Sequence, residues 1–364
     1  MKIGIDASRA LVAERTGTEE YSYSLIRHLT EIDTGGSEFV LYVKKGSDVD
    51  FELPDNFSLR ELRGNFLWTQ ISLSLEMFKR RIDVLFVPSH SLPFVHPRKT
   101  VFTVHGLEYK NCPECYSLKD RLVIDFNVKI SLGWAQQIIV PSRSTKKDLQ
   151  KIYGVAEEKI SVVYHGVEKE NLSMRVDNYG KEFFDILFIG RMERRKNVLG
   201  IVEAFDLFMK KMENGADSNK NIRLIIAGKR GFGYEKIEER ISVSPYKDNI
   251  RVEGFVSKER KRDLYLGSSL FIFPSFCEGF GIPVLEAMGY GVPVLCSRIP
   301  SLSEVVGEAA FLADPANAEE IARGIEKLYK DGDFRKKMID SGFDNLQKFD
   351  WKKCAEETFN IIKK

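Results

Sequence analysis

Two glutamates stand eight positions apart in the stretch FPSFCEGFGIPVLEAMG, Glu278 before a glycine-rich turn and Glu286 after it. A strand pattern precedes the turn, and we expect a helix to begin near Ile282. Gly279 and Gly281 let the backbone approach a ligand closely, and the amides at the start of a helix present partial positive charge to an anion. This stretch therefore predicts a site for a diphosphate or for sugar oxygens.

The two carboxylates extend this prediction, because Glu278 in the loop and Glu286 one turn inside the helix would both reach the same ligand. A hydrogen bond to a buried charged group contributes about 1.5 to 3 kcal/mol, so two of them can select a ribose and a sugar. The alternative is that Glu278 caps the helix and Glu286 is solvated, which is the better explanation of an isolated pair.

A basic segment, GRMERRKN at positions 190–197, follows another predicted strand. Asn197 can cap the next helix, and Arg191 and Lys196 can reach one anion together. A diphosphate leaving group gains negative charge as its bond to a sugar breaks, and one positioned cation stabilises that change by about 3 kcal/mol. Taken alone, two basic residues after a strand are more often surface charge.

The elements that must position these side chains follow from length and pattern. At about 150 residues per domain, 364 residues predict two domains. Short apolar runs alternate with amphipathic stretches, which indicates an α/β fold with parallel sheets covered by helices. Two such domains in tandem turn the carboxyl ends of their strands towards a central cleft, which is the expected site.

A polar stretch at about 168–182 interrupts the strand rhythm and predicts the domain boundary. We expect an N-terminal domain at 1–168, a C-terminal domain at 169–349, and a final helix at about 350–364 that packs back. The predicted strands are 2–6, 39–43, 83–87, 100–104, 137–140 and 160–164, then 183–189, 222–227, 250–254, 270–273 and 292–296. Predicted helices in the second half span 198–212, 258–267 and 318–331.

The charge balance excludes one class of partner. The formal net charge is only +2, so we expect no nucleic-acid partner. Local basic runs such as Arg80-Arg81 and Lys258–Arg262 could face an acidic membrane surface, although a solvated helix face explains most such runs. With no apolar leader or spanning segment in view, we expect a cytoplasmic protein, either free or peripheral to the inner face of the membrane.

Five cysteines make an odd and scattered set, so we expect no disulfide framework. Cys112-Pro-Glu-Cys115 has the spacing of a metal-binding pair, but zinc needs about four ligands and no second pair follows. We therefore predict that this segment is structural and that the protein holds no metal.

With these motifs in place, the sequence resembles the retaining GT-B glycosyltransferases of glycosyltransferase family 4, which use nucleotide-sugar donors. The resemblance spans nearly the whole chain. It rests on six ordered blocks: the two glutamates, GRMERRKN, LIIAGKRG at 224–231, RVEGFV at 251–256, VPSRSTKKDL at 140–149 and PSLSEVVG at 300–307.

The resemblance implies a role for each site residue. Arg191 and Lys196 hold the donor diphosphate, Glu286 binds the ribose, and Glu278 binds the transferred sugar. The implied catalytic set is His105, Glu278, Arg191 and Lys196. The implied donor-binding set shares Arg191, Lys196 and Glu278 with the catalytic set. Its other members are Gly17, Thr18, Gly228, Phe255, Val256, Gly279, Phe280, Gly281, Ile282 and Glu286. Phe255 and Val256 would lie against the base.

Two positions depart from the family pattern. The first loop, which contains Gly17 and Thr18, opens a helix whose amides could meet the diphosphate, but the family loop is richer in glycine. His165 stands where the family more often has asparagine, and we expect a hinge-side residue there.

The resemblance further implies transfer with retention of the anomeric configuration. Because no carboxylate can be defended as a covalent nucleophile, we expect front-face transfer, without a metal or other cofactor. GDP-mannose is the first expected donor and a UDP-hexose the second. The acceptor is expected to be a glycan or a lipid-linked oligosaccharide, bound by loops at 65–70, 90–96 and 105–116; the oligomeric state stays open.

Two alternatives remain. A nucleotide-sugar epimerase of the same fold would need no acceptor, and a non-catalytic two-domain sugar-binding protein would not consume its ligand. The missing export signal argues against the common periplasmic kind of binding protein.

Overall fold

The computed structural model describes the chain except for residues 13, 48, 65–66, 90, 169–182 and 214–220. The chain divides into two compact units. The first unit contains Met1–Tyr109, Leu118–Gly166 and Phe349–Lys364, and the second contains Lys110–Ser117 and Val167–Lys348. Most of the stretch that predicts the boundary, 168–182, lies outside the described residues. The short segment Lys110–Ser117 belongs to the second unit, a detail that the sequence does not reveal.

The first unit is built on a seven-stranded sheet in the order β3-β2-β1-β4-β5-β6-β7, and every pairing is parallel. Its strands are β1 (Lys2–Asp6), β2 (Glu38–Lys44), β3 (Phe57–Leu62), β4 (Val84–Val87), β5 (Lys99–Thr103), β6 (Gln137–Val140) and β7 (Ile160–Val162). Central strands such as β4 are buried along their whole length, as expected for a parallel sheet covered on both faces.

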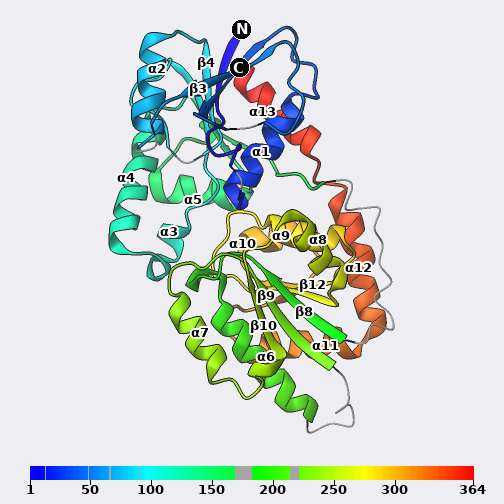
Figure 1. The fold of residues 1–364 in the computed structure, drawn as a ribbon. Coiled ribbons are helices and arrows are strands. Elements are labelled where there is room, and N and C mark those ends of the chain that lie inside the picture. Colours follow the sequence, from blue (N-terminus) through cyan, green and yellow to red (C-terminus); the bar gives the residue numbers. More distant parts are fainter. Residues whose placement is uncertain (13, 48, 65–66, 90, 169–182, 214–220) are drawn as a thin grey trace. The chain divides into compact units, whose positions relative to one another are not determined.

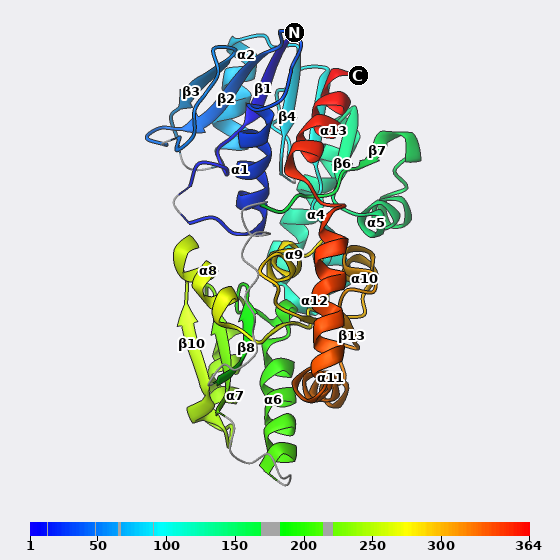
Figure 2. The same cartoon turned by 90° about the vertical axis from the view of Figure 1, so that its right-hand side faces the viewer.

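Helices cover this sheet on both sides. They are α1 (Gly17–Leu29), α2 (Ser74–Lys79), α4 (Leu118–Trp134), α5 (Arg143–Tyr153) and α13 (Trp351–Lys363), while the short α3 (Glu108–Asn111) lies where the chain passes from the first unit to the second. Helices α1 and α13 lie side by side (Figures 1 and 2), and Figure 1 shows α2 and α4 on the other side of the unit. The final helix buries Trp351, Cys354, Ala355, Phe359 and Ile362 in the first core, as its spacing predicts.

The second unit contains a six-stranded parallel sheet in the order β10-β9-β8-β11-β12-β13. Its strands are β8 (Phe183–Ile189), β9 (Asn221–Ala227), β10 (Ile250–Gly254), β11 (Leu270–Phe273), β12 (Val294–Ser297) and β13 (Phe311–Ala313). Its helices are α6 (Val198–Glu213), α7 (Tyr234–Ser242), α8 (Lys258–Gly267), α9 (Ile282–Gly289), α10 (Pro300–Val306), α11 (Ala318–Lys330) and α12 (Gly332–Leu346).

The predicted α/β class with two Rossmann-like sheets is confirmed. All the predicted strands exist, with bounds that differ by at most two residues at either end. Strands β3 and β13 and helices α7, α10 and α12 were not predicted. β3 is an edge strand whose middle positions are not buried, and α12 buries only Met338, Gly342, Asn345 and Leu346, so neither has a strong apolar pattern.

The chain segments that follow β8 and β9 in the second sheet pass very close to each other. Gly228, directly after β9, has φ +144°, and a Cβ at this position would stand 1.9 Å from the carbonyl oxygen of Gly190, directly after β8. Only glycine fits there, so the chain segments leaving β8 and β9 run in contact.

Among the described helices, none combines the length and the apolar character needed to cross a membrane. This agrees with the sequence, in which no apolar run is long enough to span a bilayer.

Candidate functional site

The chain order of the second sheet puts its switch point, the place of the ligand crevice in doubly wound sheets, between β8 and β11. From β8 the chain moves outward through β9 and β10, and it then returns to place β11 on the other side of β8. At such a reversal the connections leave in opposite directions, so the carboxyl ends of the two neighbouring strands bound a ligand-sized opening. Both motifs that the sequence singles out begin at these two strand ends.

Lys196 and Glu278 meet at this crevice. The turn Arg194–Lys196 follows β8, the loop that holds Glu278 follows β11, and the Nζ of Lys196 lies 2.5 Å from the Oε1 of Glu278. The Lys196 residue is only 9% exposed, and its ammonium also lies 4.7 Å from the ring centroid of Phe273. Residues 82 positions apart thus form one buried ion pair.

Asn197 caps the amino end of α6, as predicted. Its backbone is left-handed, with φ +56°, and its side chain accepts a hydrogen bond from the N–H of Gly200 in the first turn of α6. The side-chain amide also donates to the carbonyl oxygen of Pro315. The cap therefore stabilises the turn that ends at Lys196.

Arg195 is a site residue that sequence reasoning missed. Its Nη1 lies 3.1 Å from the Oε2 of Glu278 and donates at 2.8 Å to the carbonyl oxygen of Cys277, while its Nη2 lies 2.9 Å from the Oε1 of Glu193. The planar guanidinium suits such simultaneous contacts. The only indication of Arg195 in the sequence was its place beside Lys196 in the run Arg194-Arg195-Lys196. Adjacent side chains of one turn usually point in different directions, so this neighbourhood did not predict a shared partner.

We call Glu193, Arg195, Lys196 and Glu278 the charged cluster. Burial lowers the pKa of Lys196 and the neighbouring Arg195 lowers it further, against the opposing effect of Glu278. Burial alone would raise the pKa of Glu278, but Lys196 and Arg195 hold it below its ordinary value. The carboxylate is therefore firmly ionised, and the buried ammonium gains from any further anion that comes near.

The amino end of α9 faces the same loop. Gly281 has φ +112°, and a Cβ there would stand 2.5 Å from a side-chain carbon of Leu302, so this turn requires glycine. Ile282 begins the helix and Phe280 is buried just before it. A helix start next to Gly279 and the charged cluster adds partial positive charge to the crevice.

Glu286 lies one turn inside α9 and is bound by two residues of α8. The Nζ of Lys261 lies 2.5 Å from its Oε1, and the hydroxyl of Tyr265 donates to its Oε2 at 3.0 Å. The alternative that Glu286 is solvated is therefore wrong, because its side chain is only 14% exposed. A solvated helix face is the expectation for most of Lys258–Arg262, but Lys261 of that run is the partner of this carboxylate.

The remaining predicted residues of the second unit lie at the same carboxyl edge. Arg191 is exposed directly after β8, and within the described residues no ion pair of its guanidinium is found. Phe255 follows β10, is 43% exposed, and has the ammonium of Lys229 4.7 Å from its ring centroid, with the half-buried Val256 next to it. Side chains from four neighbouring strand ends therefore share one edge of the sheet.

The first unit holds the predicted residues Gly17, Thr18 and His105. Gly17 begins α1, which is capped by Thr16 together with Glu19, so the predicted helix start is present. The Nε2 of His105 lies 3.1 Å from the carbonyl oxygen of Pro88, which directly follows β4. The contacts predicted for these three residues with a donor remain predictions.

His105 belongs to an aromatic cluster with Tyr21, His165 and Trp351. The Tyr21 ring lies 4.7 Å from His105 and 4.4 Å from His165, between centroids, and the rings of His165 and Trp351 are stacked at 6.0 Å. His165 is only 4% exposed, and burial, followed by the effect of His105, holds its pKa well below the usual range. Its place is the core of the first unit, against the carboxy-terminal helix.

The expectation of no disulfide is wrong. Cys112 and Cys277 form one, with their Cα atoms 6.4 Å apart and 165 positions between them in sequence. Spacing along the chain could not reveal this pair, because only the fold brings Lys110–Ser117 into the second unit beside the loop after β11. The predicted acceptor loops are partly outside the described residues, which omit 65–66 and 90, and part of the third, at 110–116, lies in the second unit.

Comparison with known proteins agrees with this arrangement. Residues 15–171 match the model of Glycosyltransferase Family 4, and residues 170–344 match that of Glycosyl transferases group 1. The chain is 29% identical over 274 residues to O-antigen chain mannosyltransferase B of Escherichia coli, which covers 73% of this chain and 70% of the relative. It is 26% identical to O-antigen chain mannosyltransferase RfbU of Salmonella typhimurium, over 71% and 69% of the two chains.

Among solved structures, HepE of Anabaena in complex with UDP-glucose superposes with a TM-score of 0.74 at 15% identity, over 98% of each chain. The fold is thus that of the GT-B glycosyltransferases, whose two units each contain a doubly wound parallel sheet. The two family models together extend from residue 15 to residue 344. The chain belongs to glycosyltransferase family 4 and is a glycosyltransferase.

Proposed function

We propose that this enzyme transfers a hexose, with mannose favoured, from a nucleotide-diphosphate sugar to a glycan or lipid-linked acceptor, with retention of configuration and without a metal. The observation that carries the proposal is the buried pair of Lys196 and Glu278, held by Arg195 at the switch point beside the start of α9. The named mannosyltransferases among the relatives favour mannose, and GDP-mannose is therefore the first donor to test. A UDP-hexose is the second, since HepE was solved with UDP-glucose.

Each side chain then has a role in the donor complex. The diphosphate binds between Lys196, the exposed Arg191 and the amino end of α9, whose charges suit a dianion. Glu278 accepts hydrogen bonds from the transferred sugar, and Glu286, oriented by Lys261 and Tyr265, accepts them from the ribose. Arg195 is a positioning residue, because it holds Glu278 without being needed to touch the donor.

The transfer itself follows a front-face path. As the glycosidic bond to the phosphate breaks, the departing phosphate oxygen accepts the proton of the acceptor hydroxyl on the same face of the sugar. Lys196, Arg191 and the start of α9 stabilise the charge that develops on that phosphate. No side chain has to become a covalent nucleophile, and the cations do the work that a divalent metal does elsewhere.

An apolar surface on the first unit favours a lipid-linked acceptor and a peripheral position at the inner face of the membrane. Exposed side chains gather on the segment before and within α2, on the loop that follows β4, and along α4: Ile71, Leu75, Phe78, Phe94, Val95, Leu118, Leu122, Val123 and Phe126. The loop joins the two helices, because the N–H of Val95 donates to the Oγ of Ser74 and the N–H of Leu92 donates to the Oγ of Ser131. An apolar surface of this kind marks an interaction site.

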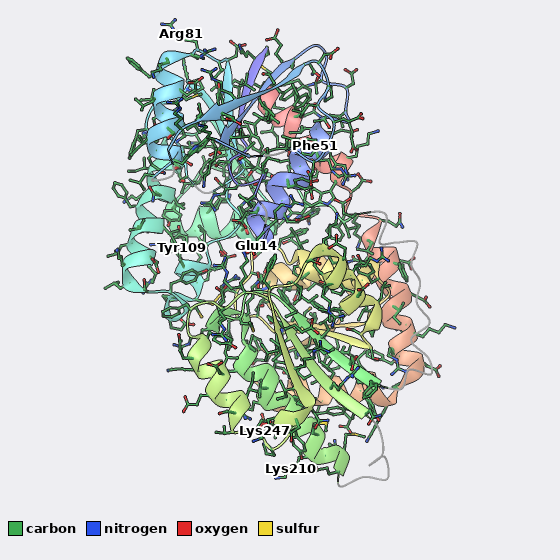
Figure 3. All side chains as sticks on the ribbon, in the orientation of Figure 1. Glu14, Phe51, Arg81, Tyr109, Lys210 and Lys247 are labelled. Carbon is green, nitrogen blue, oxygen red and sulfur yellow. A yellow bond between two sulfur atoms is a disulfide. The ribbon has the colours of Figure 1, made fainter. Side chains whose placement is uncertain are left out.

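Basic residues border this surface. Lys79, Arg80 and Arg81 are exposed at the end of α2, and Arg81 points outward from the unit (Figure 3). Each such cation near an anionic bilayer contributes about 1 kcal/mol of attraction. Sedimentation with anionic vesicles should therefore decrease for the double variant Phe78→Ser and Phe126→Ser, while equal sedimentation of variant and wild type would remove the membrane contact from the proposal.

The donor is tested by thermal shift with GDP, UDP and ADP sugars, because a ligand that binds the native state raises its melting temperature. GDP-mannose should give the largest rise, and a crystal soaked with GDP should hold the diphosphate against Lys196 and Arg191. A diphosphate bound elsewhere, with these residues and Glu286 untouched, would overturn the assignment. Consumption of the donor only when an acceptor is present separates transfer from epimerisation, which needs none, and from binding without turnover.

A further inference from the structure

Three of the five cysteines gather at one place in the second unit, beside the charged cluster. Cys112 and Cys277 are joined, Cys115 is a free thiol, and all three are buried together with Tyr116 and Phe276 packed against them. Neither the family membership nor the proposed transfer needs any of these sulfur atoms.

The third sulfur stands next to the disulfide. A short 3₁₀ turn, Pro113–Cys115, folds the Cys-Pro-Glu-Cys segment back, with the N–H of Cys115 donating to the carbonyl oxygen of Cys112 at 3.0 Å. The Sγ atoms of Cys112 and Cys115 lie within 4.8 Å of each other. Since a disulfide exchanges by attack of a thiolate on one of its sulfur atoms, Cys115 is placed to attack Cys112.

The disulfide is connected to the charged cluster through its other end. Cys277 directly precedes Glu278, and one guanidinium nitrogen of Arg195 contacts both its carbonyl oxygen and the carboxylate of Glu278. The N–H of Phe276 donates to the carbonyl oxygen of Arg195 at 2.9 Å. The bond to Cys112 therefore ties Lys110–Ser117 to the loop that positions Glu278.

The surroundings of Cys115 determine how fast it can react. Burial raises the pKa of its thiol, Glu114 and Glu193 raise it as well, and Arg194 and Arg195 oppose them. Cys115 lines a hollow together with Glu114, Arg194 and Phe276, although only 5% of the residue is exposed. Exchange should accordingly be slow at neutral pH and faster in alkaline solution.

We propose that Cys112, Cys115 and Cys277 form a thiol–disulfide exchange site with two alternative bonds. The thiolate of Cys115 attacks the Sγ of Cys112; the bond between Cys115 and Cys112 forms as the bond between Cys112 and Cys277 breaks. Cys277 leaves as a thiolate and takes up the proton that Cys115 gave up. The step is an isomerisation, so it requires no external oxidant or reductant.

The two disulfide isomers differ in which segment of the chain they constrain. The bond to Cys277 constrains the loop of Glu278, whereas the bond between Cys112 and Cys115 closes only the local turn and releases that loop. This consequence rests on the proposed function: the released isomer should bind the donor more weakly because Glu278 is less fixed. Saturating donor should in turn raise the fraction of the bond to Cys277, since linkage is reciprocal.

Disulfide mapping tests the exchange without any substrate. The full chain is incubated without reductant at alkaline pH, quenched with acid, labelled with N-ethylmaleimide and digested for mass spectrometry. Two forms should appear, one with Cys115 labelled and Cys112 bonded to Cys277, the other with Cys277 labelled and Cys112 bonded to Cys115. The Cys115→Ser variant should show the first form alone. Wild-type protein that shows only the first form after prolonged incubation would overturn the proposal.

Donor kinetics test the consequence. The Cys277→Ser variant cannot form the bond to Cys112, and its KM for the donor should rise roughly three- to tenfold. The Cys115→Ser variant should keep the wild-type KM. A wild-type KM in Cys277→Ser would remove the link to Glu278. If no nucleotide sugar were consumed at all, the proposed function would fail while the mapping result stood, so the two failures are distinguishable.

Discussion

The two units share one topology but place different side chains at the same point of it. In each sheet the strand order reverses beside the first strand, between β1 and β4 in the first unit and between β8 and β11 in the second. At the second reversal the charged cluster pairs Lys196 and Arg195 with Glu278. At the first, the carbonyl oxygen of Pro88 lies 3.1 Å from His105, which belongs to the aromatic cluster.

This difference teaches that topology provides the crevice and the side chains decide its ligand. Cations and a helix start make the second crevice suitable for a diphosphate. Rings that pack on each other, with the buried His165 held neutral, make the neighbourhood of the first an aromatic packing site. A change in the charged cluster should therefore affect turnover, and a change in the aromatic cluster should affect stability.

The largest expected effect follows from Lys196→Ala. Loss of this cation should lower kcat by roughly 10²- to 10³-fold, because its contact with the phosphate is strongest as the leaving group gains charge. Lys211→Ala is the matched control, since Lys211 is an exposed lysine that also pairs with a glutamate, Glu326. Near-normal kcat for Lys196→Ala, with an unchanged melting temperature, would contradict the role of the charged cluster.

Reduction of the disulfide comes next. Opening the bond between Cys112 and Cys277 should lower the free energy of unfolding by about 2 to 4 kcal/mol, because the cross-link restricts the unfolded chain. Denaturant unfolding with and without a reductant measures the change. In the double variant Cys112→Ser and Cys277→Ser, reductant should change nothing; a large effect there would place the sensitive bond elsewhere.

Glu286→Gln sharpens the distinction between binding and chemistry within the second unit. Loss of the charge should weaken hydrogen bonds to the ribose and raise the KM for the donor roughly 10- to 100-fold, about 1.5 to 3 kcal/mol, with a smaller change in kcat. Glu326→Gln, another lysine-paired carboxylate, serves as the control and should keep the wild-type KM. An equal loss of kcat would instead place Glu286 in the reacting centre.

The aromatic cluster predicts a dependence of stability on pH. The pKa of His165 is lowered by burial and by His105, so below about pH 6.5 the unfolded chain binds a proton that the folded chain does not. The free energy of unfolding should therefore fall as pH decreases below 6.5, by up to about 1.4 kcal/mol per unit from this residue. His165→Asn should remove that part of the slope in unfolding measured from pH 5 to 8. Parallel profiles for the two proteins would show that His165 does not contribute.

The smallest expected effect is that of chelation. If the charged cluster replaces a divalent metal, EDTA should leave turnover unchanged, whereas a loss that added magnesium restores would contradict the metal-free mechanism. The assay compares initial rates with EDTA and with EDTA followed by excess magnesium.

Much of the second unit could be predicted from the chain itself. The strands β8, β9 and β11 contain apolar runs, so the apolar pattern gives their bounds, and the glycines after β9 and before α9 mark turns that no other residue tolerates. The first core was less evident, because β3 is a half-exposed edge strand. The pairs of Arg195 with Glu278 and of Lys261 with Glu286 could not be foreseen, since charged residues look alike in sequence whether they are solvated or buried.

The sequence by itself determined the two parallel sheets, the carboxyl-edge loops and the identities of Lys196, Glu278 and Glu286, because hydrophobic period and turn chemistry are local properties. Only the tertiary structure decided that Arg195 clamps Glu278, that Lys261 and Tyr265 orient Glu286, and that His165 packs on Trp351. It also decided that Cys112 bonds to Cys277, although they are 165 positions apart. Such contacts depend on which distant segments the fold brings together. The spacing of residues along the chain does not determine how far apart two of them lie in space.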